Sequence, residues 1–108
     1  PALPDSPGHA HWGDICKSGF GGAAGLFSVI FQPRYSQHQI DAFCDSLKLF
    51  RIGYSWGGPM SLVVPYDLAA MRSGWPAHLK QGTLVRFSVG LEAAGDLQAD
   101  LEQSLQAL

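Results

Sequence analysis

The chain has 108 residues, of which 46% are hydrophobic and 15% are charged, and its formal net charge is −2. This length fits one domain, and the composition favours a packed core over disorder. The small negative charge and the scattered lysines and arginines give no electrostatic basis for binding nucleic acid or an anionic membrane. No apolar run approaches the ~20 residues that span a bilayer, and no secretory signal is visible. We therefore expect a cytoplasmic protein, and the opening Pro1 without an initiator Met leads us to expect a segment of a longer one.

The sequence predicts no metal site and no disulfide. Cys16 and Cys44 fit neither the spacing of metal ligands nor that of a disulfide framework, so we expect buried free thiols. His9 and His11 stand two positions apart without a further ligand nearby, which favours exposed or capping side chains. The remaining histidines are solitary.

The first third of the chain reads as a proline-punctuated start, a helix within residues 8–17, a glycine-rich stretch at 19–25 and a strand at 26–31. The strand is apolar, β-branched and aromatic, which predicts burial on both of its faces. The glycine-rich stretch approximates a dinucleotide-binding fingerprint. That motif must follow a strand and open a helix, whereas this stretch leads into a strand, so we reject phosphate binding here.

A helix is predicted to begin after Ser36, a natural N-cap, with Gln39 completing a capping box and Tyr35 packing onto Ile40. Short strands are predicted at 49–52, at 61–64 before Pro65, and at 84–89, with a helical turn near 68–71 and a final amphipathic helix from Ala93. The apolar stripe of this helix consists of Leu97, Leu101, Leu105 and Leu108, and the acids near its start, where the helix dipole favours them, are Glu92, Asp96 and Asp100. Successive strands with short connections predict an α+β fold, in which helices pack on one face of a largely antiparallel sheet of about four strands.

Arg86 is a candidate anion-binding residue. It lies in the middle of the predicted strand 84–89, with apolar neighbours and no acidic residue on its own strand. The strand alternates, with Val85, Phe87 and Val89 on one face and Leu84, Arg86 and Ser88 on the other. A guanidinium can hold a carboxylate through two parallel hydrogen bonds. The alternative is an arginine whose head group extends to solvent from an edge strand.

The segment Tyr54-Ser55-Trp56-Gly57-Gly58 is the second candidate, because it lies between two short predicted strands. Glycines let the main chain approach a ligand closely, and Tyr and Trp offer apolar faces with a polar end. A turn with two packed aromatic rings would show the same pattern, so both interpretations stay open at this level.

These two segments, with Ser61-Leu62 and the stretch Gly82–Glu92, resemble the C-terminal domain of the pyridoxal-phosphate enzymes of cysteine and methionine metabolism. The opening residues 1–9, the segment 25–28 and the ending 96–101 are also similar to that family, so the resemblance covers essentially the whole chain in order. Tyr-Ser-Trp-Gly-Gly resembles the bacterial cystathionine β-lyases most, since γ-synthases and γ-lyases usually carry Ser-Leu-Gly-Gly there.

The resemblance implies that residues 1–108 are the small C-terminal domain of a larger carbon–sulfur β-lyase, which would release a thiol, pyruvate and ammonia in transsulfuration and methionine biosynthesis. Arg86 would bind the α-carboxylate of an amino-acid thioether substrate. Ser55 and the main chain of Trp56 would lie beside that carboxylate, and Tyr54 and Trp56 would line the pocket. The resemblance further implies a homotetrameric full-length enzyme.

Two departures accompany the resemblance. Pro59-Met60 stands where the family commonly has an acidic residue before Ser-Leu. In addition, no lysine here has the context of the lysine that binds pyridoxal phosphate, which the family supplies from an upstream α/β domain. We expect this chain alone to hold no catalytic residue, to bind no cofactor covalently and to be inactive. The alternatives are a γ-lyase or γ-synthase of the same family and a freestanding, non-catalytic ligand-binding module.

Overall fold

In the computed structural model, the structure describes residues 5, 9–10, 24–71, 73–74 and 82–108. Residues 9 and 10 are helical, whereas the rest of the predicted helix within 8–17, Cys16 and most of the glycine-rich stretch lie outside the described residues. The described elements come in the following order along the chain: β1 (Leu26–Ile30), α2 (Gln37–Ser46), β2 (Arg51–Ile52), β3 (Leu62–Tyr66), α3 (Leu68–Met71), β4 (Leu84–Ser88) and α4 (Ala94–Leu105).

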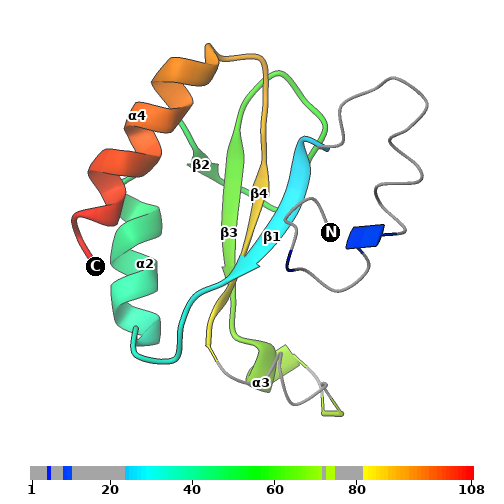
Figure 1. Cartoon of the computed structure of the whole chain (residues 1–108), viewed down its shortest axis with the longest axis vertical. Helices are drawn as coiled ribbons and strands as arrows, with labels where there is room; N and C mark the ends of the chain where they lie inside the picture. Colours follow the sequence, from blue (N-terminus) through cyan, green and yellow to red (C-terminus); the bar gives the residue numbers. More distant parts are fainter. Residues whose placement is uncertain (1–4, 6–8, 11–23, 72, 75–81) are drawn as a thin grey trace.

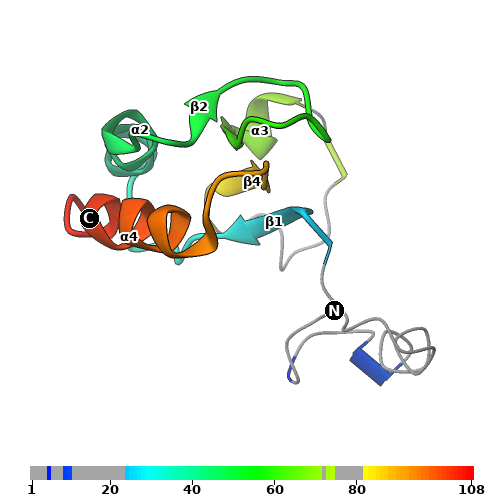
Figure 2. The same ribbon diagram turned by 90° about the horizontal axis from the view of Figure 1, so that it is seen from above.

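The strands form one four-stranded sheet in the order β1-β4-β3-β2. The helices α2 and α4 lie side by side on one face of this sheet (Figures 1 and 2), as predicted. The sheet is mixed, however, because β4 pairs antiparallel with β1 and β3 whereas β2 pairs parallel with β3. The prediction of a largely antiparallel sheet was therefore wrong. The connection at residues 53–61 causes the difference. It brings the chain back to the start of β2 before β3 begins, so that the two strands run in the same direction, whereas short connections led us to expect antiparallel neighbours.

The hydrophobic core lies between this sheet and the two long helices. Val63, Val85 and Phe87 of the sheet are at most 4% exposed, and they pack in one cluster with Ile40 and Phe43 of α2. The same cluster contains Cys44, Leu47, Phe50 and Leu97. The alternation predicted for β4 is thus confirmed, since Val85 and Phe87 share the helix side of the sheet.

The start of α2 agrees with the sequence in detail. The Ser36 hydroxyl accepts the main-chain N–H of Gln39 at 3.3 Å, and the Gln39 side chain accepts the N–H of Ser36 at 3.0 Å. This capping box satisfies main-chain donors that no helical carbonyl can reach. Tyr35 packs against the core cluster that contains Ile40, which places the preceding turn against the helix.

The first strand differs from its prediction. We expected residues 26–31 to be buried on both faces, but Leu26, Phe27 and Val29 are 38–43% exposed. The reason is topological, because β1 stands at the end of the strand order and pairs with β4 alone.

Pro65 does not close β3 as predicted, because it lies inside the strand and pairs in register with Val85. The carbonyl groups of Ser61 and Val63 accept the N–H groups of Arg51 and Gly53 at 3.0 and 3.2 Å. Odd-numbered residues of this strand therefore direct their main-chain groups toward β2. Since β2 ends at Ile52, opposite Val63, the nitrogen of Pro65 faces the sheet edge beyond β2, where a proline removes no ladder bond.

The helix α4 begins close to its predicted start, with Ala93 at the N-cap and Asp96 in its first turn. Leu97 is buried, whereas Leu105, which belongs to the same predicted apolar stripe, is 48% exposed. In the described part of the chain, no helix has the length and apolar character needed to cross a membrane.

Candidate functional site

Arg86 extends from β4 on the face of the sheet opposite the helices. Its neighbours Val85 and Phe87 are buried on the helix side, and alternate residues of a strand face opposite sides. Arg86 itself is half-buried. The same short strand therefore anchors the core with one face and presents a cationic side chain with the other.

Main-chain carbonyl groups hold the guanidinium in place. Its Nη2 donates to the carbonyl oxygen of Tyr54 at 2.7 Å, with longer contacts to the carbonyl oxygens of Gly53 at 3.4 Å and Ser55 at 3.3 Å. Within the described parts of the chain, all hydrogen-bond acceptors of this guanidinium are main-chain oxygens. Its orientation is therefore fixed by neutral groups, which leave its positive charge without a carboxylate partner among these residues.

Aromatic rings flank the guanidinium. Its central carbon lies 5.2 Å from the ring centre of Trp56 and 5.8 Å from that of Tyr66, which are distances typical of cation–π contacts. Tyr54 lies edge-on to Tyr66 with their ring centres 6.4 Å apart. Tyr54 and Trp56 are nevertheless 73% and 59% exposed. The rings of Tyr54 and Trp56 therefore present exposed apolar surface next to the guanidinium.

The loop that carries these aromatic residues is also bound to the sheet further along. The N–H of Gly57 donates to the hydroxyl oxygen of Ser88 at 3.2 Å, and Gly57 has a φ of +74°, a conformation that favours glycine. Ser88 shares the face of Arg86 and is only 2% exposed. Residues 53–57 therefore lie across the open face of the sheet, over β4.

The end of the loop is fixed by a carboxylate. Glu92 accepts the N–H of Ser61 at 2.8 Å and the hydroxyl of Ser61 at 2.7 Å. The same hydroxyl oxygen accepts the N–H of Gly90 at 2.9 Å. The main-chain N–H and hydroxyl of Ser61, followed by the N–H of Glu92 itself, lower the pKa of the Glu92 carboxyl below its ordinary value of 4.5. It is thus an ionised anchor at neutral pH.

The four residues predicted for the site come together around one point. Arg86 contacts the main chain of Tyr54 and Ser55 and the ring of Trp56. The Ser55 side chain is exposed, and the structure shows its carbonyl group, not its hydroxyl, at the guanidinium. The structure describes this juxtaposition, and the roles of the four residues in binding a substrate stay predictions.

Sequence reasoning missed Tyr66, Ser88 and the pair of Ser61 and Glu92. Ser61 and Glu92 stand in segments that carry the family resemblance, so a search for polar partners between those segments could have found them. Ser88 could have been found from the alternation of its own strand, which puts it on the face of Arg86. Tyr66 has no local signal, because only the pairing of β3 with β4 places it beside Arg86.

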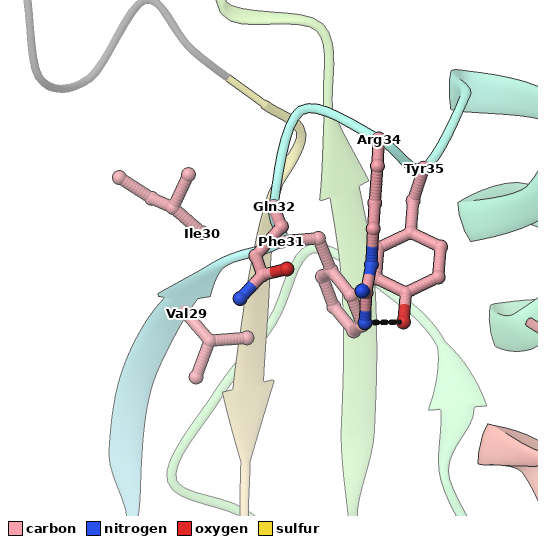
Figure 3. A pocket seen from close by; sticks show the side chains of 6 residues that line it. All are labelled: Val29, Ile30, Phe31, Gln32, Arg34 and Tyr35. Atoms are coloured by element: carbon pink, nitrogen blue, oxygen red, sulfur yellow. Dashed lines mark hydrogen bonds between the residues drawn. The ribbon is translucent and has the colours of Figure 1, made fainter.

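The described residues include one shallow hollow of about 300 Å³, apart from this cluster. It is lined by residues of β1 and of the turn before α2 (Figure 3): Val29, Ile30, Phe31, Gln32, Arg34 and Tyr35. Arg34 donates to the Tyr35 hydroxyl at 2.7 Å. In the described ranges, no group of three or more His, Cys, Asp or Glu side chains is placed to hold a metal ion.

Comparison with known proteins identifies the family to which this chain belongs. The family model described as "Cys/Met metabolism PLP-dependent enzyme" matches residues 1–106. The chain therefore belongs to the pyridoxal-phosphate-dependent enzymes of cysteine and methionine metabolism, and the predicted resemblance and cofactor class are confirmed at the level of the family.

Individual relatives carry different activities in their names. The cystathionine beta-lyase of Salmonella typhimurium is 42% identical over 104 residues, covering 94% of this chain and 25% of that protein. The L-alanine/L-glutamate racemase of Wolbachia pipientis is 39% identical over 108 residues, covering 100% of this chain and 26% of that protein.

Solved structures show the same fold. The cystathionine gamma synthase of Xanthomonas oryzae pv. oryzae, solved in complex with cystathionine, superposes with a TM-score of 0.67 at 29% identity, covering 99% of this chain and 27% of that one. The chain thus spans about a quarter of the length of these proteins.

The described residues do not themselves fit pyridoxal phosphate. The cofactor is held through a lysine, with an acidic partner for its ring nitrogen. Lys48, the lysine within the described ranges, is exposed in the turn between α2 and β2, where its N–H donates to Asp100. That turn belongs to the helix side of the sheet, whereas the guanidinium of Arg86 lies on the other side. The guanidinium of Arg86 instead has the charge and the donor geometry to bind a carboxylate.

Proposed function

We propose that this chain is the substrate-carboxylate-binding domain of a larger pyridoxal-phosphate-dependent carbon–sulfur lyase of the cystathionine β-lyase type. One observation carries the proposal. The guanidinium of Arg86 is oriented by main-chain carbonyl groups and flanked by aromatic rings, and it has no carboxylate partner among the described residues. Such a group is ready to bind an anion of the size of an α-carboxylate.

In this proposal the chain orients the substrate. Arg86 binds the α-carboxylate, the Ser55 hydroxyl and the Trp56 N–H donate to the same group, and Tyr54 and Trp56 contact the thioether chain. Pyridoxal phosphate, when bound by the rest of the enzyme, supplies an electron sink for carbanion chemistry. Fixing the carboxylate restricts rotation about Cα, so the contribution of these residues is positional.

Cystathionine turnover by the full-length enzyme tests the reaction type. A β-lyase gives pyruvate and homocysteine, whereas a γ-lyase gives 2-oxobutyrate and cysteine. Interconversion of L- and D-alanine without either product would instead assign a racemase. A genome in which these residues form a complete reading frame, without a lysine-bearing domain upstream, would support a freestanding binding module and overturn the proposal.

Substitution of Arg86 tests the site. In the full-length enzyme, Arg86→Ala should lower kcat/KM by about 30-fold or more, since losing one member of a close charge pair typically costs about 2–5 kcal/mol. The absorbance of the bound cofactor should not change. Arg34→Ala, in the hollow apart from the cluster, is the matched control. Equal kinetics for the two variants would exclude Arg86 as the carboxylate ligand.

The assembly and location of the whole enzyme also belong to the proposal. We expect a cytoplasmic homotetramer, which sedimentation of the full-length protein and fractionation of cells would test.

A further inference from the structure

The carboxylate of Glu92 connects two segments that both contribute to the proposed site. Glu92 follows β4, the strand of Arg86, and its two oxygens accept the N–H and the hydroxyl of Ser61 at 2.8 and 2.7 Å. Ser61 precedes β3 and ends the connection that carries Tyr54 to Trp56. It is 0% exposed, so the bonded hydroxyl is shielded from competing water.

The main chain around this carboxylate is tightly packed. A Cβ atom at Gly90 would overlap the carbonyl oxygen of Pro59 and would lie 2.7 Å from a Glu92 oxygen. The N–H of Leu91 donates to the same Pro59 carbonyl at 2.8 Å. The segment after β4 therefore lies directly against the last residues of the loop, and the distance between them is set by hydrogen bonds at three consecutive positions, 90–92.

The loop is also attached at three earlier points. The guanidinium of Arg86 donates to the carbonyl oxygen of Tyr54 at 2.7 Å. Gly53 at its start donates to Val63 at 3.2 Å, and Gly57 in its middle donates to Ser88 at 3.2 Å. Both are bonds between neutral groups. A hydrogen bond with an ionised acceptor is typically about twice as strong as a neutral one. Glu92 thus supplies the anionic anchor at the end of the loop, whereas Arg86 supplies the cationic contact at Tyr54.

We propose that Glu92 and Ser61 are positioning residues for the carboxylate site, because they set where the segment Tyr54–Trp56 lies over Arg86. The inference rests on the function proposed above. Neither side chain is among the contacts of the guanidinium, so they act through the loop. Glu92 anchors with both oxygens, and a neutral amide of the same shape would present an N–H₂ group toward one of the two donors.

Kinetic coupling to Arg86 distinguishes positioning from a purely structural role. In the full-length enzyme, Glu92→Gln should lower kcat/KM for cystathionine about tenfold, chiefly through KM, as expected for the loss of a charge-assisted hydrogen bond. Ser61→Ala should act in the same direction. In an Arg86→Ala background, both substitutions should change kcat/KM by less than about twofold, because the cation over which they position the segment Tyr54–Trp56 is absent.

Glu102→Gln is the matched control, since Glu102 is an exposed glutamate of α4 that accepts only the Gln98 amide among the described residues. Glu92→Gln kinetics equal to this control, or additive losses in the Arg86→Ala background, would overturn the inference. So would a failure of both the Glu92→Gln and the Ser61→Ala enzyme to fold, which would make the pair a stability element. An unaffected Arg86→Ala enzyme would instead reject the proposed function.

Discussion

The Oδ2 atom of Asp100, in α4, accepts the main-chain N–H of Leu49 at 2.8 Å, although the two residues stand 51 positions apart. The N–H groups of Lys48 and Phe50 donate to the same carboxylate at 2.8 and 3.2 Å. One side chain thereby satisfies three consecutive donors in the turn that joins α2 to β2. Asp100 is 5% exposed, so it fixes this turn to the last helix from inside the fold.

Replacing Asp100 by Asn should destabilise the chain. Both carboxylate oxygens accept main-chain N–H groups, so an amide in either orientation turns its own N–H₂ toward a donor. Each unsatisfied buried group costs about 1–3 kcal/mol, and we expect a loss of that size in the free energy of unfolding, measured with urea. The control is Asp45→Asn, at an exposed position of α2. A loss no larger than that of the control would show that the turn is held by other contacts.

The same carboxylates predict an acid limit of stability. Burial would raise the pKa of Asp100, but the N–H groups of Lys48, Leu49 and Phe50, with the Gln103 amide, lower it below its ordinary value of 3.8. The pKa of Glu92 is also lowered, from 4.5. A carboxyl group with a lowered pKa in the folded state stabilises that state above its unfolded pKa, and this stabilisation is lost as the pH falls through the folded value.

These two groups should therefore leave the urea midpoint nearly constant from pH 7 to about 5. The midpoint should fall steeply once the pH drops below the ordinary pKa values of the two carboxyl groups, 4.5 for Glu92 and 3.8 for Asp100. The Asp100→Asn chain should show a flatter acid dependence, because the substitution removes one of the titrating groups. An identical slope in both chains would mean that Asp100 does not contribute.

Two glycine-to-alanine substitutions should have opposite effects. Gly82 has a φ of +110°, and a Cβ atom there would overlap the carbonyl oxygen of Phe31. Gly82→Ala should cost at least about 1–3 kcal/mol from the backbone conformation alone. At Gly95, in α4, a Cβ atom meets nothing within 4 Å, so Gly95→Ala should stabilise by about 0.4–1 kcal/mol. Thermal unfolding of the two chains checks both signs, and a Gly82→Ala chain as stable as the parent would refute the close approach to Phe31.

Cys44 should be unreactive in the folded chain. Burial, followed by the nearby charges of Asp41 and Asp45, raises the pKa of its thiol to about 12. Thiolate is the nucleophilic form, so iodoacetamide at pH 8 should leave Cys44 unmodified until urea unfolds the chain. Mass spectrometry of peptides locates the label, and rapid native labelling at Cys44 would show that the core opens there.

The sequence predicted elements where local signals and tertiary packing agree. The capping box of Ser36 and Gln39 and the alternation of Val85, Arg86 and Phe87 need no information beyond their neighbours in the chain, and both are confirmed. Arg86 and the segment Tyr54–Trp56 could each be marked as a candidate locally. Their proximity came from the family resemblance, since no local pattern states that a loop lies over a strand 30 or so positions later.

Features that depend on strand order could not be read locally. The apolar run at Leu26–Ile30 has the composition of a buried strand, but its position at the edge leaves it partly exposed. The parallel pairing of β2 with β3 depends on the path of residues 53–61. Asp100 resembled a helix-dipole acid in the sequence, because the donors that it satisfies come from a distant turn.

The position of Pro65 has a consequence for association between chains. Its nitrogen faces the stretch of sheet edge that β2 does not reach, and exposed strand edges are templates on which other chains can add a strand. Pro65 has no N–H, so it offers no donor to a strand that would pair with this edge of β3. Exchanging Pro65 for Val or Thr would restore a free donor beside strongly β-forming side chains, so we expect such a substitution to increase edge-to-edge association.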